Sequence, residues 1–334
     1  MAVNQNPKSA ATPPAIGPAE SSAPLPRRFF RHYAFIDYAT QIYIALVAMI
    51  ILVGHSPRVP FWPTMLLAHA AGFVLIHLMI QLYARLPANF LFDFLRHYYP
   101  ILCYGAFYYE TGLLNQMLYT GYLDPYFLRF EEWLFGWQPG LEFMERCPSR
   151  LLSEILYAAY FSYYLMIGGV GLALLLRDRR QFAHFISVVS FVFYICYLIY
   201  IFTPVVGPRI LSQGVVTTPL PPDVVPATPP AVPPSVGAGV FFQIMALIYE
   251  RFETPGAAFP SSHVAVALCT VYFSFLYLRP IRWAHLAVAL LLCLSTVYGR
   301  YHYAVDVVGG ALTAALLIPL GNWLFFKFQP ANSG

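Results

Sequence analysis

Long apolar runs separated by short polar segments dominate this chain of 334 residues. A helix needs roughly 20 mainly apolar residues to cross the hydrocarbon core of a bilayer. Eight stretches have about this length and character, at residues 35–54, 62–83, 98–119, 152–176, 182–203, 261–279, 283–299 and 303–326. The pattern therefore predicts an all-α polytopic membrane bundle of about eight transmembrane helices.

Three segments outside these runs have a distinct composition. Residues 120–151 mix acidic side chains with large aromatic ones, which is typical of helices that lie on a membrane surface. Residues 204–240 contain ten prolines, and proline is excluded from helix interiors, so we expect an extended outer loop. Residues 1–26 are rich in Ala, Pro and Ser, which predicts a disordered cytoplasmic tail.

The overall composition excludes several classes of protein. Hydrophobic residues make up 59% of the chain and charged residues 10%, far from the balance of an ordinary soluble domain. Four of the five cysteines lie inside apolar runs, so neither a disulfide framework nor a CxxC metal site is expected. The net charge of +4 forms no basic stripe, and we therefore expect no nucleic-acid partner.

The distribution of basic residues predicts the orientation in the membrane. If the eight runs cross in turn, 12 of the 19 Lys and Arg residues lie on the side of the N-terminus. The positive-inside rule then places both termini in the cytoplasm. His263, His302 and Arg209 fall on the opposite side. We expect an inner or plasma membrane protein whose active site faces the extracytoplasmic side.

Two short motifs carry the candidate chemistry. The string FPSSH occupies residues 259–263 and the string YHYAVD occupies residues 301–306, each at the start of an apolar run. Ionisable side chains are costly at a membrane and usually mark a functional site. His263, His302 and Asp306 are therefore the candidate catalytic residues.

The residue types in these motifs favour phosphate chemistry. Ser261 and Ser262 follow a proline, where a hydroxyl N-cap and unpaired backbone N–H groups make an anion site. His302 and Asp306 are four residues apart, so the carboxylate reaches one imidazole nitrogen and leaves the other free to attack. Arg209 and Arg300 lie at the same edge, and guanidinium groups bind phosphate oxygens in forked pairs. Together these residues predict a phosphoryl-transfer site.

These motifs resemble the type 2 phosphatidic acid phosphatase superfamily, and within it the branch containing inositol phosphorylceramide synthases. The resemblance rests on FPSSHVA, on the His302-x3-Asp306 pair followed by two glycines, and on the string TPVVGPR that ends at Arg209. It implies a six-helix catalytic core within residues 98–330, preceded by two additional transmembrane helices within residues 27–97. It also implies a membrane lipid as donor and no metal or other cofactor.

The resemblance assigns a role to each candidate residue. His302 is expected to be the nucleophile that forms a phosphohistidine, with Asp306 as its orienting partner. His263 is expected to protonate the leaving oxygen. Arg209, Arg300 and the two serines, Ser261 and Ser262, are expected to bind the phosphate.

Departures from the family pattern bear on the acceptor. Typical phosphatases of this superfamily carry a Lys-x6-Arg-Pro motif, whereas this chain has Phe202 and Ile210 at the first and last positions. Thr296 stands where they have Arg, and Ser262 where they have Gly. The two missing cations favour a synthase-like enzyme, resembling an inositolphosphotransferase, that transfers a phosphate-containing head group to an alcohol.

Three other interpretations stay open at this point. With water as acceptor, the enzyme would be a lipid phosphate phosphatase acting on phosphatidate or polyprenyl phosphates. Eight spans with buried polar groups also suit a transporter or lipid-binding protein. A metal site made of two histidines and an aspartate is the third, although the nearby arginines would repel a cation.

The remaining polar residues within apolar runs are expected to serve packing. We predict that His69, His77, His184 and His285 form interhelical hydrogen bonds. Asp37 is expected to pair with a neighbouring helix, as is Glu110. The head group, the acceptor and the oligomeric state do not follow from the sequence.

Overall fold

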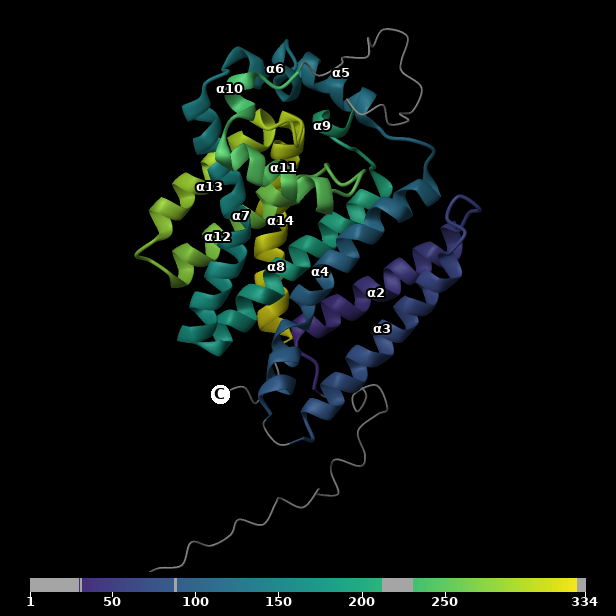
Figure 1. The fold of residues 1–334 in the computed structure, drawn as a ribbon. Coiled ribbons are helices and arrows are strands. Elements are labelled where there is room, and N and C mark those ends of the chain that lie inside the picture. Colours follow the sequence, from purple (N-terminus) through teal and green to yellow (C-terminus); the bar gives the residue numbers. More distant parts are fainter. Residues whose placement is uncertain (1–29, 31, 87–88, 212–230, 329–334) are drawn as a thin grey trace, which may run out of the picture.

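The computed structural model describes residues 30, 32–86, 89–211 and 231–328, so the predicted tail at residues 1–26 lies outside it. These described residues form 13 helices and no strand (Figure 1). The predicted all-α class is confirmed.

A helix lies at each of the eight apolar runs. Five helices are long and apolar enough to cross a membrane: α2 (Phe35–Gly54), α3 (Trp62–Tyr83), α7 (Arg150–Arg177), α8 (Arg179–Phe202) and α14 (Ala304–Lys327). Two shorter apolar helices are α12 (Ser262–Tyr277) and α13 (Arg282–Tyr298). The eighth is α4 (Phe90–Leu118), which carries more polar residues. The chain is a multi-pass membrane protein.

Helix α8 is the centre of the bundle. It packs against α2, α4, α7, α12 and α14, and 72% of its most apolar stretch is buried inside the protein. This explains its composition, because a helix surrounded by other helices is apolar on every face. Asp178 caps its N-terminus by accepting hydrogen bonds from the backbone N–H groups of Arg180 and Gln181.

A layer of short helices covers one end of the bundle (Figure 1). It comprises α5 (Asp124–Phe135), α6 (Pro139–Arg146), α9 (Pro208–Leu211), α10 (Pro234–Gly237) and α11 (Val240–Phe252). The predicted helical character of residues 120–151 is confirmed by α5 and α6. Helix α14 begins beneath this layer, in contact with α5, and ends at the opposite end of the bundle.

The extended loop predicted for residues 204–240 is wrong in part, because two short helices interrupt the residues that the structure describes. Helix α9 begins at Pro208 and α10 begins at Pro234. Proline is tolerated at the first helical position because the N–H group that it lacks has no partner there. Residues 212–230 lie outside the described part of the chain. Helix α11 was not predicted at all.

Helix α4 begins eight residues before the predicted run, at Phe90 rather than residue 98. The side chain of Asn89 caps it by accepting a hydrogen bond from the backbone N–H of Leu91. Its first turns contain the charged residues Asp93 and Arg96, so these turns do not belong to the apolar run from which the helix was predicted.

The buried polar residues join neighbouring helices as predicted. Asp37 on α2 forms an ion pair with Arg96 on α4 at 2.6 Å. His69 on α3 lies 3.4 Å from Glu110 on α4. The remaining three histidines, His77, His184 and His285, hydrogen-bond to hydroxyl groups of other segments.

Candidate active site

The N-terminal ends of α12 and α14 meet directly. The backbone N–H of Ser261 donates a hydrogen bond to the carbonyl of Asp306 at 3.1 Å, and the Ser261 hydroxyl caps α12 by accepting from the N–H of Val264. Gly310 allows this approach, because a Cβ atom there would lie 2.5 Å from the Ser261 carbonyl oxygen. Two motifs that are about 40 residues apart in sequence thus share one location.

The two motif histidines face each other across this junction. His302 Nε2 lies 3.3 Å from His263 Nδ1. On its other side, His302 Nδ1 lies 3.4 Å from Asp306 Oδ2. The same carboxylate oxygen accepts a hydrogen bond from the backbone N–H of Tyr303 at 2.9 Å, which fixes its position. The structure therefore brings together the three predicted catalytic residues in the order His263, His302, Asp306.

The position of His302 is set by the end of α13. The backbone N–H groups of Tyr301 and His302 both donate to the carbonyl of Thr296 at 3.0 Å. His302 is 3% exposed, and this burial lowers its pKa to about 4, although the Ala258 carbonyl opposes the shift. At neutral pH the imidazole is uncharged, so a nitrogen lone pair is available for attack.

Two buried carboxylates from α5 support the turn that precedes α14. Asp124 accepts hydrogen bonds from the N–H groups of Val206 and Gly207 and from the Tyr303 hydroxyl, all at 2.9 Å. Glu131 accepts from the N–H groups of Ala304 and Gly140. These contacts connect helix α5 to the turn that carries His302 and to the segment that leads to Arg209.

This role of α5 does not follow from the interpretation of residues 120–151 as helices on the membrane surface. The available signal was that aromatic residues surround Asp124 and Glu131, since a carboxylate in such surroundings is often buried. Burial raises the pKa of Glu131 to about 7, and the nearby Asp306 charge adds to the effect.

The two predicted phosphate-binding arginines lie next to each other. The backbone N–H of Arg209 donates to the carbonyl of Arg300 at 2.8 Å. The Arg209 guanidinium forms an ion pair with Glu253, which follows α11. Both arginines line a cavity of about 290 Å³, together with Tyr157, Tyr301 and side chains of α6, α11 and the segment before α10.

Stacked tyrosines stand between this cavity and the histidines. The Tyr301 ring stacks on Tyr160 of α7 at 4.7 Å and on Tyr249 of α11 at 4.1 Å between ring centroids. The Tyr160 ring in turn lies 5.2 Å from that of His263. Tyr301 thus contributes to the cavity wall on one side of the stack, and the two motif histidines lie on the other side.

The two serines and the departures from the family pattern have clear positions. The backbone N–H of Ser262 donates to the Tyr200 hydroxyl at 3.1 Å. One of the N–H groups predicted to bind an anion therefore already has a partner within the protein. Phe202 is 47% exposed on the outside of the bundle. The Thr296 hydroxyl donates to the carbonyl of Cys293 within its own helix.

No group of three or more His, Cys, Asp or Glu side chains in the described part of the chain is placed to hold a metal ion. A family model described as the PAP2 superfamily matches residues 125–320. The matched region runs from α5 into α14 and contains all seven predicted site residues. Searches among curated proteins and among solved structures returned no match.

Proposed function

Because the chain belongs to the PAP2 superfamily and is therefore a phosphatase or phosphotransferase, we propose that it moves a phosphate-containing head group from a membrane lipid to an alcohol. Enzymes of this superfamily act on lipid phosphates, which makes a membrane lipid the donor. The observation that carries the proposal is the position of His302, with His263 at 3.3 Å on one side and Asp306 at 3.4 Å on the other.

In the first step His302 Nε2 attacks the phosphorus atom of the donor lipid. A nitrogen–phosphorus bond forms and the phosphorus–oxygen bond to the lipid alcohol breaks. His263, which the adjacent phosphate anion favours in its protonated form, gives its proton to the departing oxygen. The phosphorus group enters between the two imidazoles and replaces their direct contact. Asp306 holds the Nδ1 proton and stabilises the positive charge that develops on the ring.

In the second step an acceptor alcohol attacks the phosphohistidine. His263, now neutral, takes the hydroxyl proton, the nitrogen–phosphorus bond breaks, and His302 returns to its initial state. Arg209 and Arg300 line the cavity beyond the tyrosine stack, so we assign their positive charge to holding the anionic head group there, next to the histidines rather than between them. Glu253 must give up part of its hold on Arg209 when the phosphate binds, because one guanidinium fork cannot serve both fully.

The surroundings of His302 support an alcohol rather than water as acceptor. The side chain is almost fully buried, and its neighbour His263 lies 5.2 Å from Tyr160 of the tyrosine stack between ring centroids. Aromatic walls disfavour free water and accommodate the carbon skeleton of an organic acceptor. The adjoining 290 Å³ cavity has the size of a small polar head group or acceptor.

Product analysis tests this proposal. Purified protein in detergent, with a chelator present, is incubated with phosphatidate alone and with phosphatidylinositol plus ceramide or diacylglycerol, and products are identified by mass spectrometry. We expect a new phospholipid that is absent with His302→Ala. Release of free phosphate from phosphatidate, with no transfer, would make the protein a lipid phosphate phosphatase instead.

A further inference from the structure

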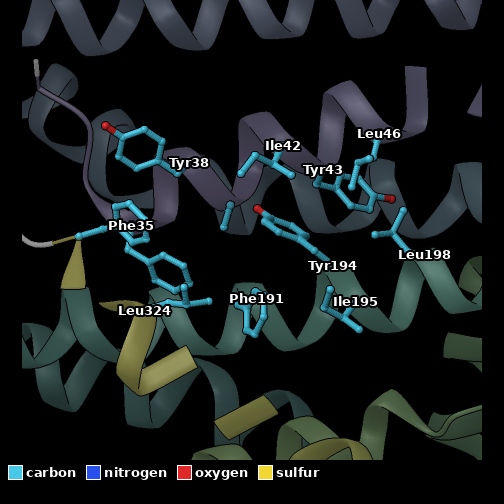
Figure 2. A pocket seen from close by; sticks show the side chains of 12 residues that line it. Phe35, Tyr38, Ile42, Tyr43, Leu46, Phe191, Tyr194, Ile195, Leu198 and Leu324 are labelled. Atoms are coloured by element: carbon cyan, nitrogen blue, oxygen red, sulfur yellow. The ribbon is translucent and has the colours of Figure 1, made fainter. Parts of the chain in front are cut away.

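A second pocket lies far from the catalytic residues, between α2 and α8 (Figure 2). Its volume is about 460 Å³, and every side chain that lines it is aliphatic or aromatic. Figure 2 shows one row of side chains from α2, including Ile42 and Leu46, facing a second row from α8, including Phe191 and Leu198. Leu324 and Phe328, at the end of α14, close the pocket at one end. We call it the α2–α8 groove.

The groove does not belong to the catalytic unit of the family. Eight of its 12 lining residues lie outside the matched region 125–320, on α2 and at the end of α14. It also lies toward the end of the bundle opposite to the layer that carries the active site (Figure 1). It is therefore a feature of this chain, formed where an additional helix crosses the central helix α8.

The dimensions of the groove match a lipid chain. From Phe35 to Leu46 the axis of α2 rises about 16 Å at 1.5 Å per residue. One leaflet of a bilayer accounts for about half of the roughly 30 Å hydrocarbon core. The groove thus extends from a helix end to about the bilayer midplane. Within a membrane, an apolar cavity of this kind takes up hydrocarbon, because water gains no hydrogen bonds there.

The end of the groove at the membrane surface carries polar and basic groups. The ring of Tyr38 lies 5.5 Å from that of Phe328 across the opening between α2 and α14. Lys327 Nζ lies 4.5 Å from the centre of the Trp323 ring, which is outside the groove, and 5.8 Å from that of Phe328, which lines it. A tyrosine and a lysine at this level are typical of a lipid head-group region, and an ammonium group attracts a phosphate.

We propose that the α2–α8 groove binds one acyl chain of an anionic phospholipid, with the lipid phosphate held near Lys327. The lipid comes from the leaflet on the side of the last turn of α14. Its chain fills the space between α2 and α8, so it fastens the additional helix to the catalytic unit without taking part in the reaction. This inference does not depend on the proposed donor or acceptor.

The test measures lipid binding to the full-length protein. The protein is delipidated in detergent and then titrated with dioleoylphosphatidylglycerol or dioleoylphosphatidylcholine, and bound lipid is counted by native mass spectrometry. We expect one tightly bound phosphatidylglycerol per chain. Ala39→Trp, which fills the groove, should weaken this binding at least tenfold. Val53→Trp, on the same helix but 80% exposed away from the groove, is the matched control and should bind as the wild type does.

Two further variants keep the test decisive. Ile42→Trp lies at the rim and is 57% exposed, so it blocks the groove without disturbing buried packing if Ala39→Trp fails to fold. Lys327→Gln should bind both lipids equally, because the charge that selects phosphatidylglycerol is gone. The proposal is overturned if Ala39→Trp and Ile42→Trp both bind phosphatidylglycerol as the wild type does. It is also overturned if Val53→Trp weakens this binding as much as they do. A wild-type dimer that Ile42→Trp converts to a monomer overturns it as well, since a second copy would then fill the groove.

Discussion

At the scale of single residues, the geometry around His302 depends on a few backbone contacts. Its ring lies between His263 and Asp306, and its backbone N–H is fixed by the Thr296 carbonyl. The carboxylate of Asp306 is held in turn by the backbone N–H of Tyr303. The proposed nucleophile and its proposed orienting group are therefore positioned by helix ends rather than by flexible loops.

Asp306→Asn tests the orienting role. The amide oxygen of Asn keeps the acceptor for the Tyr303 N–H, but the charge that stabilises the imidazolium is lost. We expect the turnover number to fall by roughly 10² to 10⁴, as when the aspartate of a Ser-His-Asp triad is replaced. Steady-state rates with the donor and acceptor in excess measure the effect. An unchanged turnover number would show that Asp306 serves only as a helix cap.

His263→Ala tests the proton donor. A general acid matters most when the leaving oxygen is strongly basic. We therefore expect a large loss of rate with a lipid donor and a much smaller loss with a nitrophenyl phosphodiester, whose leaving group needs no proton. Comparing the two substrates in wild type and variant gives the answer. Equal losses for both substrates would argue against proton donation by His263.

The convergence of His263, His302 and Asp306 could be predicted because it depends on local signals. Its prediction needs only that the two helices begin on the same side of the membrane and that His302 and Asp306 are four residues apart. The ion pair between Arg209 and Glu253 could not be predicted, and neither could the stacking of Tyr301 on Tyr249. Both depend on how α11 folds over the bundle, a long-range packing event that leaves no periodic signal in the sequence.

At the scale of helices, the contact between α12 and α14 aligns the two motifs. Gly310 lies at the closest approach, and Gly309 next to it would place a Cβ atom 2.6 Å from the ring of Phe259. The pair of glycines after Asp306 is thus explained by packing.

Gly310→Ala should push the start of α14 away from Ser261, because the added methyl group would lie 2.5 Å from a backbone oxygen. A shift of this kind costs of the order of 10²-fold in activity when it misplaces a catalytic group. We expect that loss with a folded protein. Gly168→Ala on α7, where nothing lies within 4 Å, is the matched control and should keep full activity. Equal activity of the two variants would contradict the packing account.

Helix α5 confers a pH dependence on stability through Glu131. Its pKa rises from an ordinary value near 4.5 to about 7 in the folded protein, so folding favours the protonated form. This contribution is fully present below pH 4.5 and is lost as the pH rises through about 7. The loss amounts to up to about 3 kcal/mol at 1.36 kcal/mol per pKa unit.

Glu131→Gln keeps the side-chain volume and an acceptor oxygen but cannot ionise. Thermal unfolding of both proteins in detergent, followed from pH 4.5 to 8, isolates the effect of this carboxyl group. We expect the stability of the wild type to fall relative to that of the variant as the pH rises. A constant difference across this range would show that Glu131 keeps an ordinary pKa.

The prediction of helices succeeded where a long apolar run is enough to specify the helix. All eight apolar runs contain helices, and α2 and α3 have the predicted bounds, residues 35–54 and 62–83. The start of α4 was missed because it is polar, and α9 and α10 because they begin at prolines in a proline-rich segment. Helix α11 is apolar but has only 13 residues, too few for the length expected of a membrane span.

At the scale of the whole molecule, the two ends of the bundle carry different features. One end carries the layer of short helices, the histidine pair and the arginine-lined cavity. The α2–α8 groove extends from the other end toward the middle. Which end faces the cytoplasm stays a prediction from the distribution of basic residues. The groove was not predicted, because it requires the crossing of α2 over α8.

The central claim is that His302 carries the phosphate-containing group during transfer. The most direct measurement is to incubate the purified enzyme with a donor lipid labelled at phosphorus, in the absence of acceptor, and to map the label after rapid quenching. We predict a label on the peptide containing His302, its discharge when acceptor alcohol is added, and no label in His302→Ala. Undiminished turnover by His302→Ala, or a label on another residue, would contradict the account.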